Sequence, residues 1–175
     1  MTDLDYDRLI AHALPAVAAA ANFQLAHRAN GLNFQHKSDS SPVTEADRQS
    51  ESVITAALAA AMPGVAIVGE EATSEGRVPA LTNPFFLVDP LDGTREYIAG
   101  NDDFTINIAL ISDGTPIFGI VAAAAHGEIF LTTGPATAVA GLLTPAMTAD
   151  PKSVTLSHLS PRSITTRLPR LDALT

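Results

Sequence analysis

The sequence predicts an α+β domain with two leading helices packed on an antiparallel sheet. Apolar residues recur at helical spacing between residues 4 and 62, and short apolar runs separated by turn signals follow between residues 65 and 131. Helices at one end of a chain and strands at the other are typical of layered α+β folds. With 175 residues, of which 46% are hydrophobic, the chain is long enough for one such globular unit.

Two helices are expected in the first part of the chain. The first spans residues 4–28, where apolar side chains repeat at helical spacing, and it ends at the Asn-Gly pair of residues 30–31. Pro15 lies inside this helix and cannot donate a hydrogen bond to the preceding turn, so we expect a bend there or the start of a new helix. The second helix begins at Thr44 and ends near residues 62–64.

Short apolar runs predict the strands of the sheet. Buried strands are expected at residues 65–68 and 85–88, each of which leads directly into acidic residues. An alternating run at residues 104–111, a turn and a returning run at residues 116–121 predict a hairpin. Residues 127–131 predict the next strand of a meander in which sequential strands pair.

Composition limits the classes of partner. The formal net charge of −9 disfavours nucleic acid and anionic membranes, because like charges repel. The alanine-rich stretches at residues 16–21 and 56–61 are far shorter than the roughly 18–20 residues of a membrane-spanning helix, so no membrane span is expected. Cysteine is absent, which rules out disulfides and thiolate sites and favours a reducing, cytoplasmic location. A phosphorylated metabolite would require bound cations to offset the charge of the protein.

The strongest chemical signal is the hexapeptide Asp-Pro-Leu-Asp-Gly-Thr at residues 89–94, which follows an apolar strand. Asp89 and Asp92 lie three positions apart, and a tight turn containing Gly93 would let both carboxylates face one cation. Magnesium prefers oxygen ligands and usually takes only one or two protein carboxylates. Thr94 would open a helical turn whose amide groups face a phosphate.

Each part of this signal has a structural alternative. The hexapeptide alone would more often be a polar turn with a helix cap, but Glu70 and Glu71 follow the preceding strand and would reach the same edge if the two strands are neighbours. Asp47 follows Thr44 by three residues, which fits either a helix cap or an acid that supports the site, and both alternatives stay open. The five histidines show no metal-ligand spacing.

Three segments carry a family resemblance. Residues 41–47, 69–71 and 89–94 resemble, in order and in separation, motifs of the lithium-sensitive, magnesium-dependent phosphatase superfamily, which includes inositol monophosphatase and the 3'(2'),5'-bisphosphate nucleotidases. The resemblance implies the N-terminal domain of the layered sugar-phosphatase fold. Residues 95–98 and 103–111 look most like the nucleotidase branch, which implies substrates such as adenosine 3',5'-bisphosphate.

The resemblance also implies roles for residues of this chain. Magnesium would be bound by three carboxylates and one main-chain oxygen, those of Glu70, Asp89, Asp92 and Leu91. Gly93 and Thr94 would hold the phosphate of the substrate. Asp47, Glu70 and Thr94 would be catalytic, with Asp47 and Thr94 positioning or deprotonating the attacking water in a two-metal mechanism.

The resemblance extends over residues 9–158, and two departures limit it. The chain has no Trp, so the Trp-Asp motif that completes the second metal site in the family is missing. Where nucleotidases tend to show Ser-Arg-Ser-His, residues 155–158 are Thr-Leu-Ser-His. We therefore expect a metal- and phosphate-binding domain at residues 1–150, an irregular segment at residues 134–152, and the truncated start of a second domain at residues 151–175.

Two classes of function follow. The first is a magnesium-dependent phosphomonoester hydrolase of the bisphosphate nucleotidase type, which converts adenosine 3',5'-bisphosphate to AMP and phosphate; inositol monophosphatase is the alternative with the same chemistry. The second class is a noncatalytic truncated fragment that retains the metal site. A small phosphorylated metabolite is the expected partner of the enzyme. Exposed sheet edges lead us to expect a homodimer or a complementary chain as a further partner.

Overall fold

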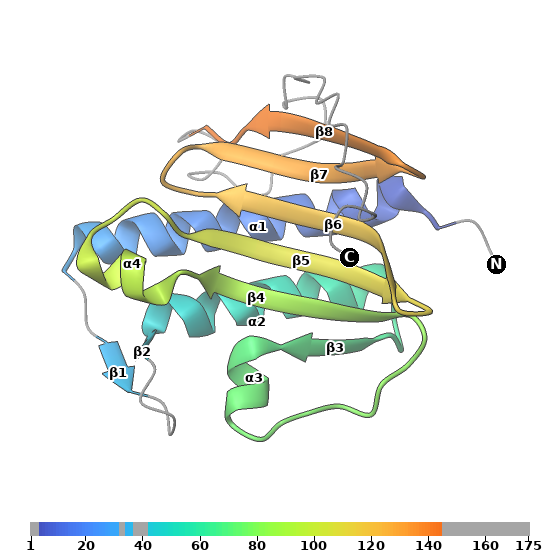
Figure 1. The fold of residues 1–175 in the computed structure, drawn as a ribbon, viewed down its shortest axis with the longest axis horizontal. Coiled ribbons are helices and arrows are strands. Elements are labelled where there is room, and N and C mark those ends of the chain that lie inside the picture. Colours follow the sequence, from blue (N-terminus) through green and yellow to red (C-terminus); the bar gives the residue numbers. More distant parts are fainter. Residues whose placement is uncertain (1–3, 32–33, 37–41, 145–175) are drawn as a thin grey trace, which may run out of the picture.

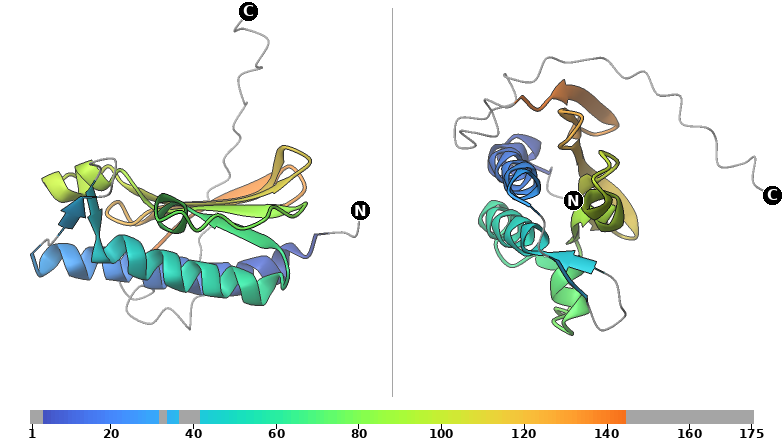
Figure 2. Two further views of the ribbon diagram at one scale, coloured as in Figure 1. Left: turned by 90° about the horizontal axis from the view of Figure 1, so that it is seen from below. Right: turned by 90° about the vertical axis from the view of Figure 1, so that its left-hand side faces the viewer.

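The computed structural model describes residues 4–31, 34–36 and 42–144, and it confirms the predicted α+β architecture with two leading helices packed on a sheet (Figure 1). The helices are α1 (Tyr6–Ala29), α2 (Glu45–Ala61), α3 (Glu70–Ser74) and α4 (Thr94–Ala99). The strands are β1 (Phe34–His36), β2 (Pro42–Thr44), β3 (Ala66–Gly69), β4 (Phe85–Asp92), β5 (Thr105–Ser112), β6 (Thr115–Ala123), β7 (Glu128–Gly134) and β8 (Thr137–Leu142). In side view α1 and α2 lie next to each other on one face of the large sheet (Figure 2).

Helix α1 runs continuously through Pro15, so of the two expected outcomes the start of a new helix is excluded. Asp5 caps its N-terminus by accepting a hydrogen bond of 2.9 Å from the Arg8 amide. By length and composition alone α1 is apolar enough to cross a membrane. In this fold, however, apolar side chains such as Leu14 and Val17 are buried in the core formed with α2 and the sheet, so α1 serves as a core helix.

Helix α2 begins where the sequence predicts it, with Thr44 as its N-cap. The Thr44 hydroxyl accepts the Asp47 amide at 3.4 Å, and the Asp47 carboxylate accepts the Thr44 amide at 2.7 Å, which together form a capping box. Further along the helix, Ile54 and Leu58 lie one turn apart on the same side, and both are fully buried in the core.

The large sheet has the strand order β3-β4-β5-β6-β7-β8. Strands β5, β6 and β7 form the predicted antiparallel meander, and β4 and β8 extend it in antiparallel pairing at its two ends. Strand β3 joins it in parallel to β4, with Gly69 opposite Val88, because the connection through residues 70–84 returns the chain to the same end of the sheet. The sheet is therefore mixed, and the residues that follow β3 and β4 emerge at the same edge.

Some strands differ from the sequence-based expectations. The segment expected to be irregular contains β8, which follows a turn in which Ala136 has a φ of 54°. Strand β3 is an edge strand whose side chains are mostly half-buried, so the buried strand expected at residues 65–68 is wrong in that respect. Strands β1 and β2, which form a separate antiparallel pair, were not predicted. The expected second domain at residues 151–175 lies outside the described residues.

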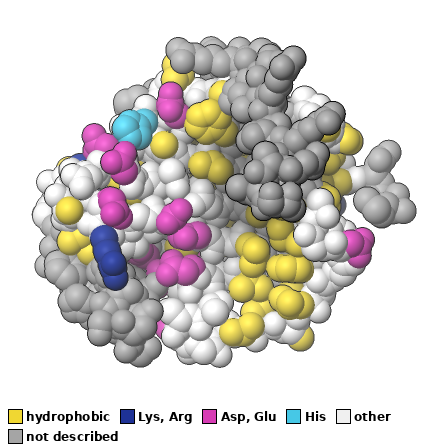
Figure 3. Space-filling view, viewed as in Figure 1, with side chains coloured by type: hydrophobic (Ala, Val, Ile, Leu, Met, Phe, Trp, Pro, Cys, Tyr) yellow, Lys and Arg dark blue, Asp and Glu magenta, His cyan; other side chains and the backbone are white. Residues whose placement is uncertain are grey.

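The two faces of the sheet differ in what covers them. Side chains such as Phe86 and Ile120 point toward the helices and are fully buried, whereas their neighbours in the strands point the opposite way. Leu87, Val121 and Phe130 are among these outward-pointing side chains and are exposed. Apolar side chains accordingly appear on the face of the molecule that is turned away from the helices (Figure 3).

Candidate active site

Two strand ends bring acidic side chains together at one edge of the sheet. Because β3 and β4 are parallel and Gly69 lies opposite Val88, Glu70 and Asp89 follow at the same edge, as the sequence-based argument expected. Acidic side chains gather on this part of the sheet face (Figure 3). Burial, followed by the negative charges of Glu70 and Asp92, raises the pKa of Asp89 to about 6. The carboxylates are therefore close enough to repel one another.

The turn of residues 89–94 is shaped by its own backbone and by β5. The Asp89 Oδ1 atom accepts the Leu91 amide at 3.2 Å, which acts against the rise in the Asp89 pKa. The pairing register of β4 with β5 shifts between Asp89 and Asp92, which is the irregularity of a β-bulge. Asn107 on β5 donates from Nδ2 to Asp92 Oδ2 at 3.1 Å and so orients the second carboxylate of the turn.

Gly93 is needed at the point where the turn enters α4. Its φ of 89° lies in the left-handed region, which residues other than glycine rarely adopt. A Cβ atom at this position would also lie 2.7 Å from the main-chain oxygen of Asp103. The glycine therefore allows the sharp change of direction that makes Thr94 the first residue of α4.

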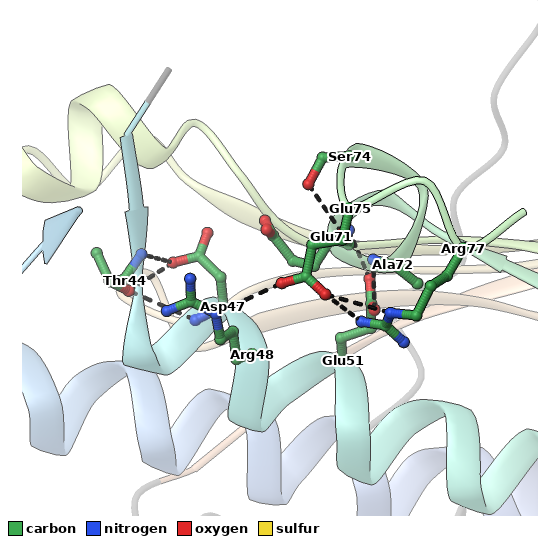
Figure 4. A network of polar contacts seen from close by, with 9 residues as sticks. All are labelled: Thr44, Asp47, Arg48, Glu51, Glu71, Ala72, Ser74, Glu75 and Arg77. Carbon is green, nitrogen blue, oxygen red and sulfur yellow. Dashed lines mark hydrogen bonds and ion pairs between the residues drawn. The ribbon is translucent and has the colours of Figure 1, made fainter. Parts of the chain in front are cut away.

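Thr94 and Asp47 connect the turn to α2. The Thr94 Oγ1 atom lies 3.0 Å from the carbonyl oxygen of Leu91 and 3.4 Å from Asp47 Oδ1, so its single proton is shared between two acceptors. The Asp47 side chain is fully buried, and its Oδ2 atom accepts hydrogen bonds from the amide and the hydroxyl of Thr44 (Figure 4). Asp47 thus caps α2, as one of the two alternatives expected, and it also contacts Thr94; its role as an acid that supports the site stays a prediction.

Buried side chains that were not predicted support the site from behind. Gln24 of α1 donates from Nε2 to the carbonyl oxygen of Pro90 at 2.8 Å, and the Tyr97 hydroxyl donates to the carbonyl oxygen of Gln24 at 2.7 Å. Glu51 of α2 accepts the amide of Glu71 at 2.7 Å. Gln24 and Glu51 both lie on the buried faces of their helices. A polar residue on an apolar helix face is the sequence signal that would have found them.

The donor groups at this edge are oxygens, which a hard cation such as magnesium prefers. The carboxylates of Glu70, Asp89 and Asp92 and the carbonyl of Leu91 could hold such an ion. A cation would offset the repulsion from Glu70 and Asp92 that, together with the larger effect of burial, raises the Asp89 pKa. Across residues 4–31, 34–36 and 42–144, no group of three or more His, Cys, Asp or Glu side chains is already arranged as a metal site. The donor chemistry of these residues fits magnesium.

Comparisons with known proteins show the family to which the chain is similar. A model described as the inositol monophosphatase family matches residues 5–165. The chain is 40% identical over 104 residues to the 3'(2'),5'-bisphosphate nucleotidase CysQ of Salmonella typhimurium, and the match covers 59% of this chain and 42% of that protein. An inositol monophosphatase from Zymomonas mobilis superposes with a TM-score of 0.61 and 31% identity, over 78% of this chain and 51% of that one.

A second solved structure gives a similar result. CysQ from Bacteroides thetaiotaomicron, described as a bacterial member of the inositol monophosphatase family, superposes with a TM-score of 0.57 and 27% identity. That superposition covers 75% of this chain and 49% of the other. The chain therefore spans about half the length of these solved structures and 42% of the curated relative from Salmonella typhimurium.

Proposed function

This chain belongs to the inositol monophosphatase family, and on that premise we propose that it carries the metal- and phosphate-binding part of a magnesium-dependent phosphomonoesterase. The observation that supports the proposal most directly is the meeting of Glu70 and Asp89 at the joint end of the parallel strands β3 and β4, where burial and then the charges of Glu70 and Asp92 raise the pKa of Asp89. A cluster of carboxylates at the joint end of two parallel strands is what a divalent cation would stabilise.

In this proposal Glu70, Asp89, Asp92 and the carbonyl oxygen of Leu91 hold the magnesium. When bound, magnesium would lower the pKa of a water molecule and screen the charge of a phosphate ester. The same cations would let a protein with a net charge of −9 accept an anionic substrate.

The remaining residues act on the phosphate and on the attacking water. Gly93 and Thr94, where the turn enters α4, hold the phosphate. The Thr94 hydroxyl is within 3.4 Å of Asp47 Oδ1, so a water bound to Thr94 can lose its proton through that hydroxyl toward the buried carboxylate. Glu70 is exposed beside Asp89, where it can orient a water as well as bind metal.

The substrate class we propose is a nucleoside 3',5'-bisphosphate such as adenosine 3',5'-bisphosphate, with AMP and phosphate as products. Two observations support it: residues 95–98 and 103–111 resemble the nucleotidase branch, and the Salmonella typhimurium relative is a 3'(2'),5'-bisphosphate nucleotidase. Inositol monophosphate is the second candidate, since the Zymomonas mobilis structure is an inositol monophosphatase. The cysteine-free composition favours a reducing compartment, and the proposal places the enzyme in the cytoplasm.

Parallel phosphate-release assays test the proposal. We expect magnesium-dependent release from adenosine 3',5'-bisphosphate, faster than release from inositol 1-phosphate, and loss of release with a chelator or in Asp89→Asn. Faster turnover of inositol 1-phosphate would replace the substrate with the second candidate. Magnesium binding without release from either compound would instead favour a noncatalytic fragment that retains the metal site.

A further inference from the structure

The carboxylate of Glu51 is buried between α2 and the start of α3, next to the acidic cluster of Glu70, Asp89 and Asp92. Glu51 belongs to α2, and only 7% of its surface is exposed. Its Oε2 atom accepts the amide of Glu71 at 2.7 Å, and its Oε1 atom accepts the amide of Ala72 at 2.9 Å. In the close view, Glu51 reaches from α2 toward the first turn of α3 (Figure 4). Both oxygens of one side chain are therefore used to hold the backbone that follows Glu70.

Gly69, which precedes Glu70 in the chain, packs against the same Glu51 carboxylate. Its φ of −90° is open to any residue, so the conformation does not require glycine. The space does require it, because a Cβ atom here would lie 2.5 Å from both the Cδ and the Oε2 atoms of Glu51. The end of β3 and the start of α3 are thus packed on one buried carboxylate, with Glu70 between them.

Burial of a carboxylate is costly unless hydrogen bonds replace its hydration, and here two main-chain amides do so. An apolar residue would fill the same space without that cost, but it would leave the two amides without their acceptors. The arrangement fixes the backbone around Glu70, which follows β3 at the sheet edge where Asp89 lies on β4.

We propose that Glu51 is a positioning residue for Glu70: through the amides of Glu71 and Ala72 it sets the direction from which the Glu70 carboxylate approaches Asp89, and hence the magnesium affinity of the site. This inference rests on the proposed function, because it concerns the same metal site. Residues that orient metal ligands in this way typically contribute about 10- to 100-fold to metal affinity.

The inference can be tested without any assay of activity, by measuring the thermal unfolding of the 175-residue chain at increasing magnesium concentrations. In Glu51→Gln the side-chain amide accepts one N–H group and turns its own NH2 toward the other, so we expect magnesium affinity to fall about tenfold or more. Gly69→Ala pushes the same carboxylate away while every charge stays in place, and we expect a similar loss. If Glu51→Gln does not unfold cooperatively, the magnesium affinity of Gly69→Ala alone tests the role of Glu51.

The control is Tyr6→Phe, which removes a 3.2 Å hydrogen bond from Tyr6 to the carbonyl oxygen of Ile117 and should leave magnesium affinity within about twofold of the parent. If Glu51→Gln and Gly69→Ala lose stability but bind magnesium as tightly as the parent, Glu51 is only a structural residue and the inference fails. If the parent shows no magnesium-dependent stabilisation, the proposed function fails as well, so the two failures are distinguishable.

Discussion

Asp89→Asn should make the metal-free protein more stable at neutral pH. The folded structure raises the Asp89 pKa from 3.8 to about 6, mainly by burial and then by the charges of Glu70 and Asp92. A carboxyl group with a raised folded pKa favours folding least when it is ionised in both states. Its unfavourable contribution grows as the pH rises from 3.8 through about 6 and is complete above that.

The size of the effect follows from the same values. At about 1.4 kcal/mol per pKa unit, the difference between 3.8 and about 6 corresponds to roughly 3 kcal/mol. Asp89 is only half-buried, and solvent screening reduces this to about 1–2 kcal/mol. The asparagine Oδ1 can still accept the Leu91 amide that Asp89 accepts at 3.2 Å, so the substitution removes the charge with little loss of hydrogen bonding. At about 2–4 °C per kcal/mol, we expect the Tm to rise by about 2–8 °C.

Thermal unfolding in the presence of a chelator, at about pH 7.5 and about pH 4, measures this effect. The gain should appear at the higher pH and vanish at the lower one. Added magnesium should reverse the order, because it stabilises the parent and not the variant. Asp103→Asn is the matched control, since the side chain of Asp103 is 85% exposed and lies outside the cluster. A Tm for Asp89→Asn no higher than that of the control, or a gain that persists unchanged at the lower pH, would refute the reasoning.

Two further substitutions test the packing behind the turn, each by urea denaturation. Gln24→Leu removes the 2.8 Å donor to the Pro90 carbonyl and should lower the free energy of unfolding by about 1–3 kcal/mol, whereas Gln49→Leu on the exposed side of α2 should change it little. Equal effects of the two would contradict a role for Gln24. Gly93→Ala should lower the free energy of unfolding by about 1–3 kcal/mol more than Gly76→Ala does. Both glycines have a positive φ, but of the two only Gly93 would bring a Cβ atom against a main-chain oxygen, at 2.7 Å. A smaller loss at Gly93 than at Gly76 would show that the turn can relax.

The sequence predicted the elements whose signals are local. Thr44 with Asp47 marks the start of α2, and the alternation at residues 104–111 marks β5, because caps and period-two patterns depend only on neighbouring residues. Strand β8 has weaker strand residues, including Ala138, Ala140 and Gly141, and it forms by pairing with β7 at the sheet edge. That pairing is a tertiary effect, which composition alone does not reveal.

The sequence indicated the acidic residues that follow the two strands. It did not indicate the polar residues that contact this region from distant positions in the chain. Glu70 and Asp89 meet because β3 and β4 are parallel, which the strand ends suggested. Gln24 lies 66 residues from Pro90 in the chain, and Glu51 lies 20 residues from Glu71. Each of these contacts exists only after α1 and α2 have packed on the sheet, so the sequence could indicate an unusual polar residue but not its partner.

The placement of Tyr97 gives this domain an optical probe of its own. The chain contains two Tyr and no Trp, so tyrosine dominates its near-ultraviolet spectrum. Tyr97 is fully buried behind the turn, donates to the Gln24 carbonyl at 2.7 Å, and has its ring edge-on to Phe104 at 5.0 Å. Burial, and next the charge of Asp47, raises the pKa of Tyr97 to about 12 despite the opposing effect of Arg28. The phenol of Tyr97 therefore keeps its proton in moderately alkaline solution while it stays buried. Its share of the tyrosine dichroism, beside that of Tyr6, reports on the contact between α1 and α4 without an added label.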